Sequence, residues 1–537
     1  MKIFYTCCIL YLLLIGLVSH AQPNIQKSLY IQEKHCYAKR LIYWDMRAHP
    51  NGSVFGAALV QGNPSTEHDV MITKFNAQFD TVWHKRYGGS REDKILYIDI
   101  LPNQNLLLTG TTNSHDGDVP YGQTVSASDI WLLEIDTNGV IQKGRTIKGY
   151  NGSGVSSVVI SSDNYIYLCG STSSDQFDFT HAGYGWPDKD GWYAKLDTAF
   201  NLRWIKFLVS NTSDEPSMMA EISPSRFIVG TVTASTDSSL NGWEDRGHGD
   251  MVLDYIDSAG NILWQKRIGG SDVEDLNKCV VDLNTKEIYA SGITGSLDGD
   301  ITYRTEPNVH DYLNWVVKLD TLGNLLASKA YGTRHNDTVT SDIYAWDAIW
   351  HNNQLWTICT TDGEGGDVDP NCNLGIGNGW IGVYDHQANL VNKYTVNGFG
   401  VERLNSIFEK DGDIWFSGYS SANPHTNTFS CDTTSIFDFI FNLREAPLQQ
   451  GKITSELTFK VFPNPSQQSF VVNWPNSPSY ENVAVKVWDT QGKIYWQQKL
   501  QQSQSVTIPC KTWPFGNYII QLTNEQGQST MQQILKQ

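Results

Sequence analysis

Carboxylates separated by a single residue recur at three places in the chain. They are Asp116 and Asp118, Asp298 and Asp300, and Asp367 and Asp369. Paired carboxylates around a tight turn suit Ca²⁺, which takes roughly six to eight oxygen ligands. The full EF-hand spacing is absent, and Asp and Gly also favour such turns with no ion bound. The sequence therefore leaves a calcium site and a simple turn as alternatives.

Two further sets of acids recur along the chain. The first, in which each acid begins a similar apolar stretch, comprises Asp69, Asp129, Asp190 and Asp250. Because its spacing is so regular, we expect this set to fix a turn in every repeat. The second set lies in another recurrent loop and comprises Asp93, Asp214 or Glu215, and Asp275. A carboxylate-based hydrolase or lyase would use Asp or Glu of these loops or of the loops that carry the paired carboxylates.

Aromatic side chains lie in the equivalent loops of several repeats, two of them in loops that also carry paired carboxylates. They are Tyr121, Tyr184, Trp186, Trp243 and Tyr303. Aromatic faces beside carboxylates suit stacking on sugars and binding of hydroxyl groups, although packing between long loops would use the same residues. The histidines of these loops are scattered over different repeats: His115, His181, His248 and His310. No H-E-x-x-H, G-x-S-x-G or phosphate-binding motif occurs, and the catalytic residues stay unknown.

These residues are carried by a sequence repeat. The stretch DMVLDYIDSAGNILWQKRIGG at 250–270 has related copies that begin 59 to 65 residues apart, at Asp69, Asp129, Asp190, Asn314, Gly379 and Asp438. Seven copies at a nearly fixed period predict an array in which each unit buries its face against its neighbours.

Each repeat contains four strand signals, which is typical of a propeller blade. The seventh repeat lacks its fourth strand, and Ser28–Lys34 at the start of the mature chain supplies a matching one. We therefore expect an all-β fold with a seven-bladed β-propeller over residues 26–446, closed by an N-terminal strand. An open array of eight partial units is the alternative. In a blade of this topology, the loops that carry the candidate residues lie on one face.

Composition narrows the classes of function. The net charge is −18, only 18% of residues are charged, and the chain has 18 Trp, 25 Tyr and 20 Phe. A surface this acidic repels phosphate backbones, so we expect no nucleic-acid partner.

The cysteines form neither a disulfide framework nor a C-x-x-C metal or redox site. Cys169, Cys279 and Cys359 lie in apolar strand contexts, so we expect them in the core. Cys372 and Cys431 fall in equivalent loops of consecutive repeats, where one bridge between them is an open alternative.

The N-terminus has the features of an export signal. Lys2 precedes an apolar run from Ile9 to Val18, and Ser19-His20-Ala21 forms a small-residue cleavage site. We expect residues 1–21 to be removed. No Cys follows the cleavage site, so a lipoprotein anchor is not indicated, and no transmembrane segment is expected.

The repeat pattern stops after Arg444. Residues 447–457 read as a polar linker, and residues 458–537 carry seven short strand signals that predict a small β-sandwich.

Both parts resemble known families. The stretch Asp311–Trp315, with Lys318-Leu319-Asp320 and Gly323-Asn324, resembles β-propeller repeats of secreted Bacteroidota proteins. The C-terminal part resembles the type A sorting domain of the type IX secretion system; the residues that carry the resemblance are Phe462, Pro463, Asn464, Pro465, Asp489, Gly492, Lys493, Gly516, Tyr518 and Lys536. This second resemblance implies recognition by the outer-membrane translocon, followed by release or attachment at the cell surface.

The sequence thus predicts an exported protein whose propeller binds or displays, with a glycan or a protein as ligand. A polysaccharide hydrolase or lyase that uses Asp or Glu of the loops is the alternative, and a structural surface component is the third. Clustered acids and histidines that do not repeat would favour the enzyme. A broad aromatic surface would favour binding. No cofactor other than Ca²⁺ is indicated.

Overall fold

The chain divides into two compact units, Met1–Ala446 and Pro447–Gln537. The computed structural model describes residues 24–31, 41–61, 68–119, 128–180, 189–208, 210, 212–233, 249–305, 311–333, 343–361, 366–368, 377–396, 402–420, 437–444, 459–464, 466–474, 482–489, 493–501, 504–524 and 529–536. The expected signal peptide and linker lie outside these ranges, as do Cys36, Cys372 and Cys431. None of the described residues forms a helix with the length and apolar character that crossing a membrane requires.

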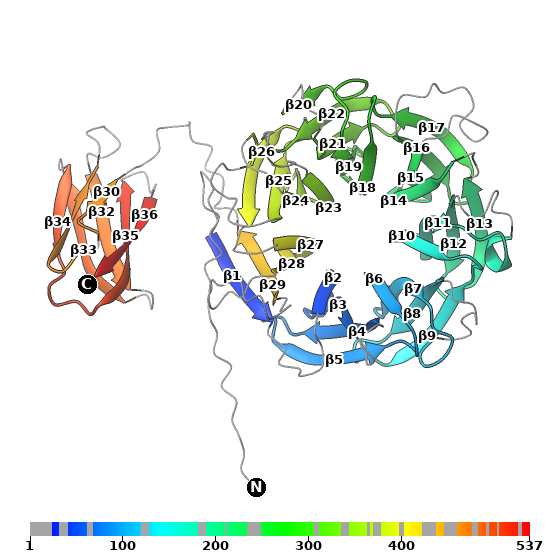
Figure 1. Cartoon of the computed structure of the whole chain (residues 1–537), viewed down its shortest axis with the longest axis horizontal. Helices are drawn as coiled ribbons and strands as arrows, with labels where there is room; N and C mark the ends of the chain where they lie inside the picture. The colour runs from blue at the N-terminus through cyan, green and yellow to red at the C-terminus, as the bar shows by residue number, and fades with distance from the viewer. Residues whose placement is uncertain are drawn as a thin grey trace, which may run out of the picture. The chain divides into compact units, whose positions relative to one another are not determined.

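Over its described residues, the first unit consists of seven separate β-sheets. Figure 1 shows them standing around a common centre like the blades of a propeller. One strand of each sheet faces that centre: β2 (Leu41–Ala48), β6 (Asp93–Ile100), β10 (Ser153–Ile160), β14 (Asp214–Ser223), β18 (Glu274–Val281), β23 (Ile343–His351) and β27 (Glu402–Lys410).

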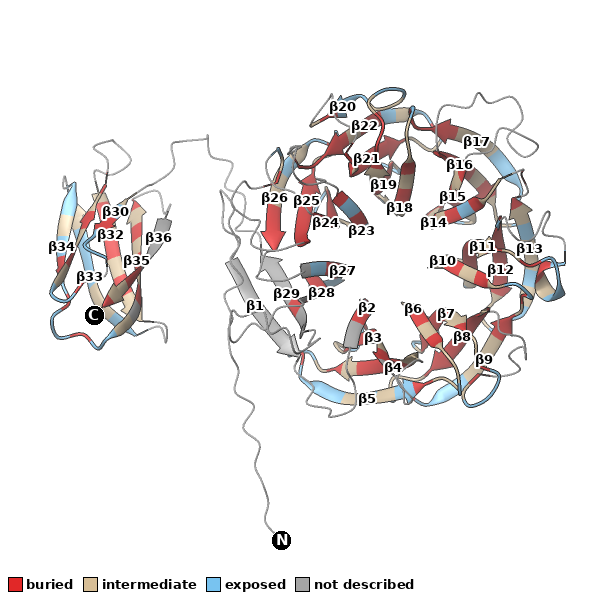
Figure 2. Ribbon diagram, viewed as in Figure 1, coloured by how far each residue is buried: buried red, intermediate tan, exposed pale blue. Residues whose placement is uncertain are grey.

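The two middle strands of each sheet form the core. The second strands are β3 (Val54–Gln61), β7 (Leu106–Thr112), β11 (Tyr165–Thr172), β15 (Arg226–Thr233), β19 (Ile288–Thr294), β24 (Gln354–Thr361) and β28 (Asp413–Ser420). The third strands are β4 (His68–Phe75), β8 (Asp129–Ile135), β12 (Asp190–Asp197), β16 (Asp250–Asp257), β21 (Leu313–Leu319), β25 (Asn378–Tyr384) and β29 (Phe437–Arg444). Every residue of β8, β21 and β25 is buried, because neighbouring sheets cover both faces (Figure 2).

The outermost strands are partly exposed, as the alternating pattern of β5 illustrates. They are β5 (Thr81–Tyr87), β9 (Ile141–Ile147), β13 (Leu202–Leu208), β17 (Ile262–Ile268), β22 (Leu325–Tyr331) and β26 (Leu390–Val396). A short fifth strand, β20 (Tyr303–Arg304), lies parallel to β22, and a single 3₁₀ turn, η1, spans Phe177–Phe179. The remaining sheet is completed by β1 (Asn24–Ile31), which pairs antiparallel with β29.

The D-x-x-G-N pattern of the repeat builds the turn between the third and fourth strands. One oxygen of Asp257 accepts hydrogen bonds from the main-chain N–H groups of Ala259 and Asn261, both at 2.9 Å. Gly260 between them has a φ of +76°, which side-chain-bearing residues rarely adopt.

These turns also link neighbouring sheets. The ammonium group of Lys74 donates to the carbonyl of Thr137 at 2.9 Å, and Lys318 donates to that of His386 at 2.7 Å. In both cases a lysine of the third strand reaches the turn of the next sheet. The lysine of the K-L-D pattern is therefore a link between repeats.

The second unit is a two-sheet sandwich. Its sheets have the strand orders β30-β31-β34 and β33-β32-β35-β36. The bounds are β30 (Lys460–Phe462), β31 (Ser469–Asn473), β32 (Asn482–Asp489), β33 (Ile494–Gln501), β34 (Ser505–Pro509), β35 (Gly516–Asn524) and β36 (Ser529–Lys536). Phe470, Val485 and Ile520, contributed by both sheets, are fully buried in its core.

Candidate functional site

A β-bulge interrupts every innermost strand at the same place. Each register shift leaves one residue outside the ladder: Trp44, Leu96, Ser156, Ser217, Asn277, Trp346 and Asn405. Bulges commonly re-aim side chains at the rims of barrels and next to active sites. Here the bulge repeats in all seven sheets, whereas the unpaired residue is Trp, Ser or Asn in two sheets each and Leu in one.

All seven bulge residues line one cavity of about 800 Å³. Because each innermost strand contributes to its wall, the cavity lies at the centre of the ring of sheets (Figure 1). Thr233 and Gly249, at the ends of β15 and β16, also line it, so the cavity reaches the face on which the candidate loops lie. A concave site of this size fits a small ligand or a few sugar rings.

Two partly exposed tryptophans line this cavity. Trp44 of β2 is 38% exposed and Trp346 of β23 is 39% exposed. The indole N–H of Trp346 donates to Thr360 Oγ1 at 2.8 Å, which fixes the ring, and the guanidinium of Arg403 lies 5.7 Å from the ring centroid. Asn405 Nδ2 donates to the carbonyl of Tyr43 at 2.9 Å. The sheets that begin with β23, β27 and β2 thus form one aromatic and basic wall.

The cavity also contains ion pairs. Arg47 lies 3.3 Å from Asp45 and 3.8 Å from Asp99, and Lys278 lies 3.0 Å from Asp347. Burial raises the pKa of Asp99 to about 6, although the charge of Arg47 opposes the shift. Burial likewise raises the pKa of Asp45. These acids are therefore already engaged with basic groups of the wall.

Two other acids lie in the part of the cavity wall formed by β14 and β18. Both belong to the second set of the sequence analysis, Glu215 and Asp275. Burial raises the pKa of Asp275, and the charge of Glu215 adds to the shift. Among the described groups, the Oδ1 atom of Asp275 has no hydrogen-bond partner.

The paired carboxylates instead hold the Gly-Gly turn after the outermost strand. Asp116 accepts from the N–H of Ser90 at 2.7 Å, and Asp118 accepts from that of Gly88 at 3.3 Å. Buried Asp93 accepts from the N–H of Gly89 at 2.7 Å. Three carboxylates therefore bind three consecutive main-chain N–H groups.

The same arrangement recurs three sheets further along the ring, in the sheet that begins with β18. Glu274 takes the place of Asp93 and accepts from Gly270 N at 2.8 Å, while Asp298 accepts from Ser271 N at 2.8 Å and Asp300 from Gly269 N at 3.1 Å. A Cβ atom on Gly270 would lie 2.5 Å from that of Ser296, so only glycine fits. This geometry supports the turn-forming interpretation.

The third pair of carboxylates is described only in part. Asp367 accepts from the N–H of Gly332 at 3.1 Å, in the same manner as the other pairs, and Asp369 lies outside the described residues. Calcium binding by these loops stays a prediction.

The other predicted residues fall into three groups. Of the acids that begin the third strand, Asp129 accepts from the N–H of Gly149 at 3.0 Å, and Asp190 and Asp250 are buried. Tyr303 is exposed, its ring centroid 5.2 Å from that of Tyr331, and His115 is also exposed. Several residues lie outside the described ranges: Tyr121, Tyr184, Trp186, Trp243, His181, His248 and His310. The expected core residues Cys169, Cys279 and Cys359 are buried, as predicted.

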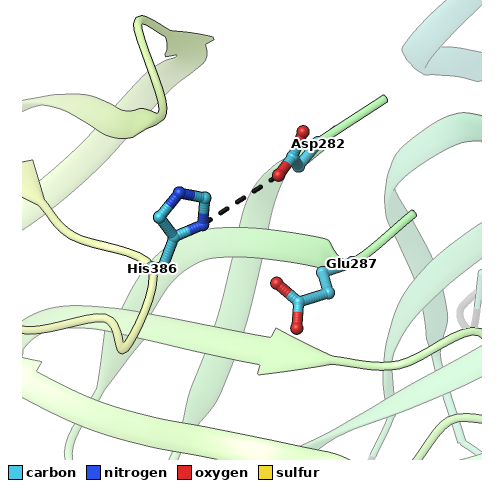
Figure 3. Close-up of side chains that lie close together, drawn as sticks. All are labelled: Asp282, Glu287 and His386. Carbon is cyan, nitrogen blue, oxygen red and sulfur yellow. Dashed lines mark ion pairs between the residues drawn. The ribbon is translucent and has the colours of Figure 1, made fainter. Parts of the chain in front are cut away.

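A separate group of possible metal ligands joins two neighbouring sheets. The ligating atoms of Asp282, Glu287 and His386 all lie within 4.8 Å of one another (Figure 3). The ammonium group of Lys318, however, lies 2.8 Å from Glu287 and already supplies a positive charge. The geometry therefore favours an ion-pair network that supports the lysine link.

In the second unit, the described motif residues gather around β36. Asn464 Oδ1 accepts from the N–H of Leu535 at 2.8 Å, Gly516 pairs with buried Lys536, and Tyr518 pairs with Asp489. The peptide bond between Phe462 and Pro463 is cis. Asp489 accepts a hydrogen bond from the N–H of Lys493 at 3.0 Å. Pro465 and Gly492 lie outside the described residues.

Comparison with known families bears on this second unit. Residues 460–537 match the model of the secretion system C-terminal sorting domain family. The match supports the predicted type IX secretion tag and indicates export to the cell surface or the medium. No curated protein sequence matches the chain.

Solved structures resemble the chain only distantly. Acylaminoacyl peptidase from Pyrococcus horikoshii is 10% identical with a TM-score of 0.41, over 83% of this chain and 59% of that one. Hydrazine synthase from Kuenenia stuttgartiensis is 15% identical with a TM-score of 0.42, over 74% and 97%. Polysaccharide lyase Uly1 is 10% identical with a TM-score of 0.43, over 79% and 94%. The chain thus spans little more than half of the peptidase, and similarities at this level carry no argument about activity.

The sequence analysis missed most of the cavity. It assigned Trp44, Arg47, Lys278, Trp346 and Arg403 to no site, because they lie in strands rather than loops. The signal that could have found the two tryptophans is variation within the repeat, because the bulge position holds Trp, Ser and Asn in two sheets each and Leu in one.

Proposed function

We propose that this chain is an exported carbohydrate-binding protein and that its ligand enters the central cavity. The observation that carries the proposal is the pair of exposed tryptophans, Trp44 and Trp346, on the cavity wall. Aromatic rings left accessible in a concave, partly polar site provide flat apolar surfaces for the C–H faces of sugar rings. Asn277 and Ser217, on the part of the cavity wall formed by β18 and β14, supply hydrogen-bonding groups for hydroxyls.

The ring of sheets is proposed to be a closed seven-bladed propeller. Pairing of β1 with β29 supports closure, and so do contacts between the first and last sheets. The rings of Phe79 and Trp415 have centroids 4.4 Å apart, and Asn405 donates to Tyr43. Closure packs the first sheet against the last and fixes the width of the cavity.

Secretion is proposed to follow the type IX route, with residues 1–21 removed and the type A sorting domain read by the outer-membrane translocon. The match over residues 460–537 supports this assignment. The passenger then acts at the cell surface or in the medium, where polysaccharides are accessible.

A polysaccharide hydrolase or lyase is the second candidate function, and one observation favours it. Asp275 lines the cavity, its pKa is raised, and it neighbours Glu215 on the adjacent sheet. A carboxyl group of this kind has the protonation behaviour of a general acid. If the chain is an enzyme, Asp275→Asn abolishes cleavage of a bound polysaccharide and leaves its binding intact.

The binding proposal is tested with a glycan array probed by the purified mature chain, residues 22–537, with and without Ca²⁺. Wild type is expected to bind a restricted set of glycans, and the double variant Trp44→Ala, Trp346→Ala to lose them while keeping the wild-type melting temperature. Tyr303→Ala is the matched control, since it removes an exposed aromatic ring outside the cavity. An array with no hits, or hits that survive the double substitution, would refute the proposal.

A further inference from the structure

Arg403 differs from the other basic residues of the cavity. Arg47 is paired with Asp45 and Asp99, and Lys278 is paired with Asp347. Within the part of the chain that the structure describes, Arg403 takes part in no ion pair, and its recorded contact is with the Trp346 ring. Its side chain is exposed and lines the cavity.

Stacking prepares this guanidinium for a ligand. The Trp346 ring is held by its hydrogen bond to Thr360, so the guanidinium above it has a fixed surface to lie on. Among the described residues this guanidinium has no acidic partner, and its N–H groups match the two oxygens of a carboxylate or a sulfate. Trp44, on the next sheet, offers a second exposed ring beside the same wall.

We propose that the carbohydrate bound in the cavity is acidic and that Arg403 binds its carboxylate or sulfate group. This inference rests on the proposed function. Trp346 and Trp44 stack on the sugar rings next to that group, and Asn405 of the same strand contacts a neighbouring hydroxyl.

The distribution of charge across the ring gives such a ligand one orientation. Glu215 and Asp275 belong to β14 and β18, and Figure 1 shows β14 across the ring from β27, which carries Arg403. Since like charges repel, the anionic group of the ligand is directed to the Arg403 wall. Salt screens the effect of more distant charges of the chain, whose net charge is −18, over about 10 Å.

The test uses pairs of oligosaccharides that differ only in charge or nearly so. Oligogalacturonate is compared with its methyl ester for the carboxylate, and κ-carrageenan oligosaccharide with the same oligosaccharide after desulfation for the sulfate. Any acidic glycan that binds on the array is compared with its neutralised form in the same way. Calorimetric titration of the mature chain is expected to give at least tenfold tighter binding of an acidic member than of its neutral partner, and the pair that responds identifies the acid.

Variants of one residue decide the role of the arginine. Arg403→Gln is expected to abolish the preference for the acidic member, and Arg403→Lys to keep part of it, because an ammonium group retains the charge but not the bidentate geometry. Arg86→Gln, which removes the same charge from outer strand β5, leaves the preference unchanged.

The outcomes separate this inference from the proposed function. Binding of neutral glycans only, or an acidic preference that Arg403→Gln leaves intact, overturns the inference but not the carbohydrate-binding role. Absence of any glycan binding, or binding that persists without Trp44 and Trp346, overturns both.

Discussion

Glu274 is the residue at which burial and charge conflict most clearly. It is fully buried and accepts hydrogen bonds from the N–H of Gly270 and from Thr294 Oγ1, at 2.8 and 2.6 Å. Burial raises the pKa of its carboxyl group to about 7, and the nearby charge of Asp250 adds to the shift. The turn is thus held by a group that takes up a proton near neutral pH.

Stability should therefore depend on pH through this residue. The folded-state pKa of about 7 lies above the ordinary value of 4.5, so the folded protein binds an extra proton between them and loses stability as pH rises from about 4.5 to about 7. Glu274→Gln should flatten this dependence and raise the free energy of unfolding at pH 8 by on the order of 1–3 kcal/mol.

Denaturant unfolding at pH values between 4.5 and 8 measures this effect. Glu92→Gln, at a partly exposed position, is the control and should keep the slope of wild type. An identical slope for Glu274→Gln and wild type would show that the carboxyl group does not titrate in this range.

At the scale of elements, a lysine of the third strand links some repeats to the next, as Lys74 and Lys318 do. Lys318 of β21 reaches the carbonyl of His386 at 2.7 Å and pairs with Glu287 at 2.8 Å, in a position where its side chain is only 10% exposed. Removing one partner of a buried, charged hydrogen bond leaves the other unsatisfied, which costs more than the bond itself contributes.

Lys318→Met is accordingly expected to lower the free energy of unfolding by about 1–3 kcal/mol. Lys329→Met serves as the control between the same two sheets, because Lys329 donates to the carbonyl of Gln387 and to Asn389 at an exposed position. Equal effects of the two substitutions in chemical denaturation would contradict a special role for the buried lysine.

The pairing of β1 with β29 gives a second prediction at this scale. Deleting residues 22–34 removes the strand that completes the last sheet and exposes the edge of β29. We expect the melting temperature to fall by roughly 5 °C or more, with increased aggregation. Unchanged melting and solubility would mean that the N-terminal strand contributes nothing to closure.

For the molecule as a whole, the all-β architecture was predictable because turn-forming residues recur at regular intervals between short apolar stretches. Asp257, Gly260 and Asn261 fix the tight turn between the third and fourth strands of one sheet. Similar spacing in other repeats predicts the corresponding turns. Period-two alternation of apolar residues in the third strands was a poorer guide to exposure, since both faces of β8 are buried. The residues that line the central cavity were not identified, because a β-bulge is defined by strand pairing, which the local sequence does not reveal.

Among the loop residues, sequence reasoning located the acids but not their partners. Asp116 and Asp118 have the spacing of cation ligands, yet they bind the N–H groups of Ser90 and Gly88 from a segment about 30 residues away along the chain. Contacts between segments this far apart depend on the packing of strands, which local pattern does not reveal.

The C-terminal sorting domain leads to a prediction about where the chain is found in the cell. Deleting Thr458–Gln537 should leave the chain in the periplasm, because the match to secretion sorting domains covers that segment. Fractionation followed by immunoblotting measures the distribution. Normal appearance of the truncated chain outside the cell would contradict the sorting role.

The most direct test of the central claim is a crystal structure of the mature chain with a glycan that binds on the array. The account predicts a sugar ring in the cavity, in contact with Trp44 and Trp346 and with its charged group at Arg403. Electron density for the glycan on the outer loops, with the cavity free of sugar, would contradict it.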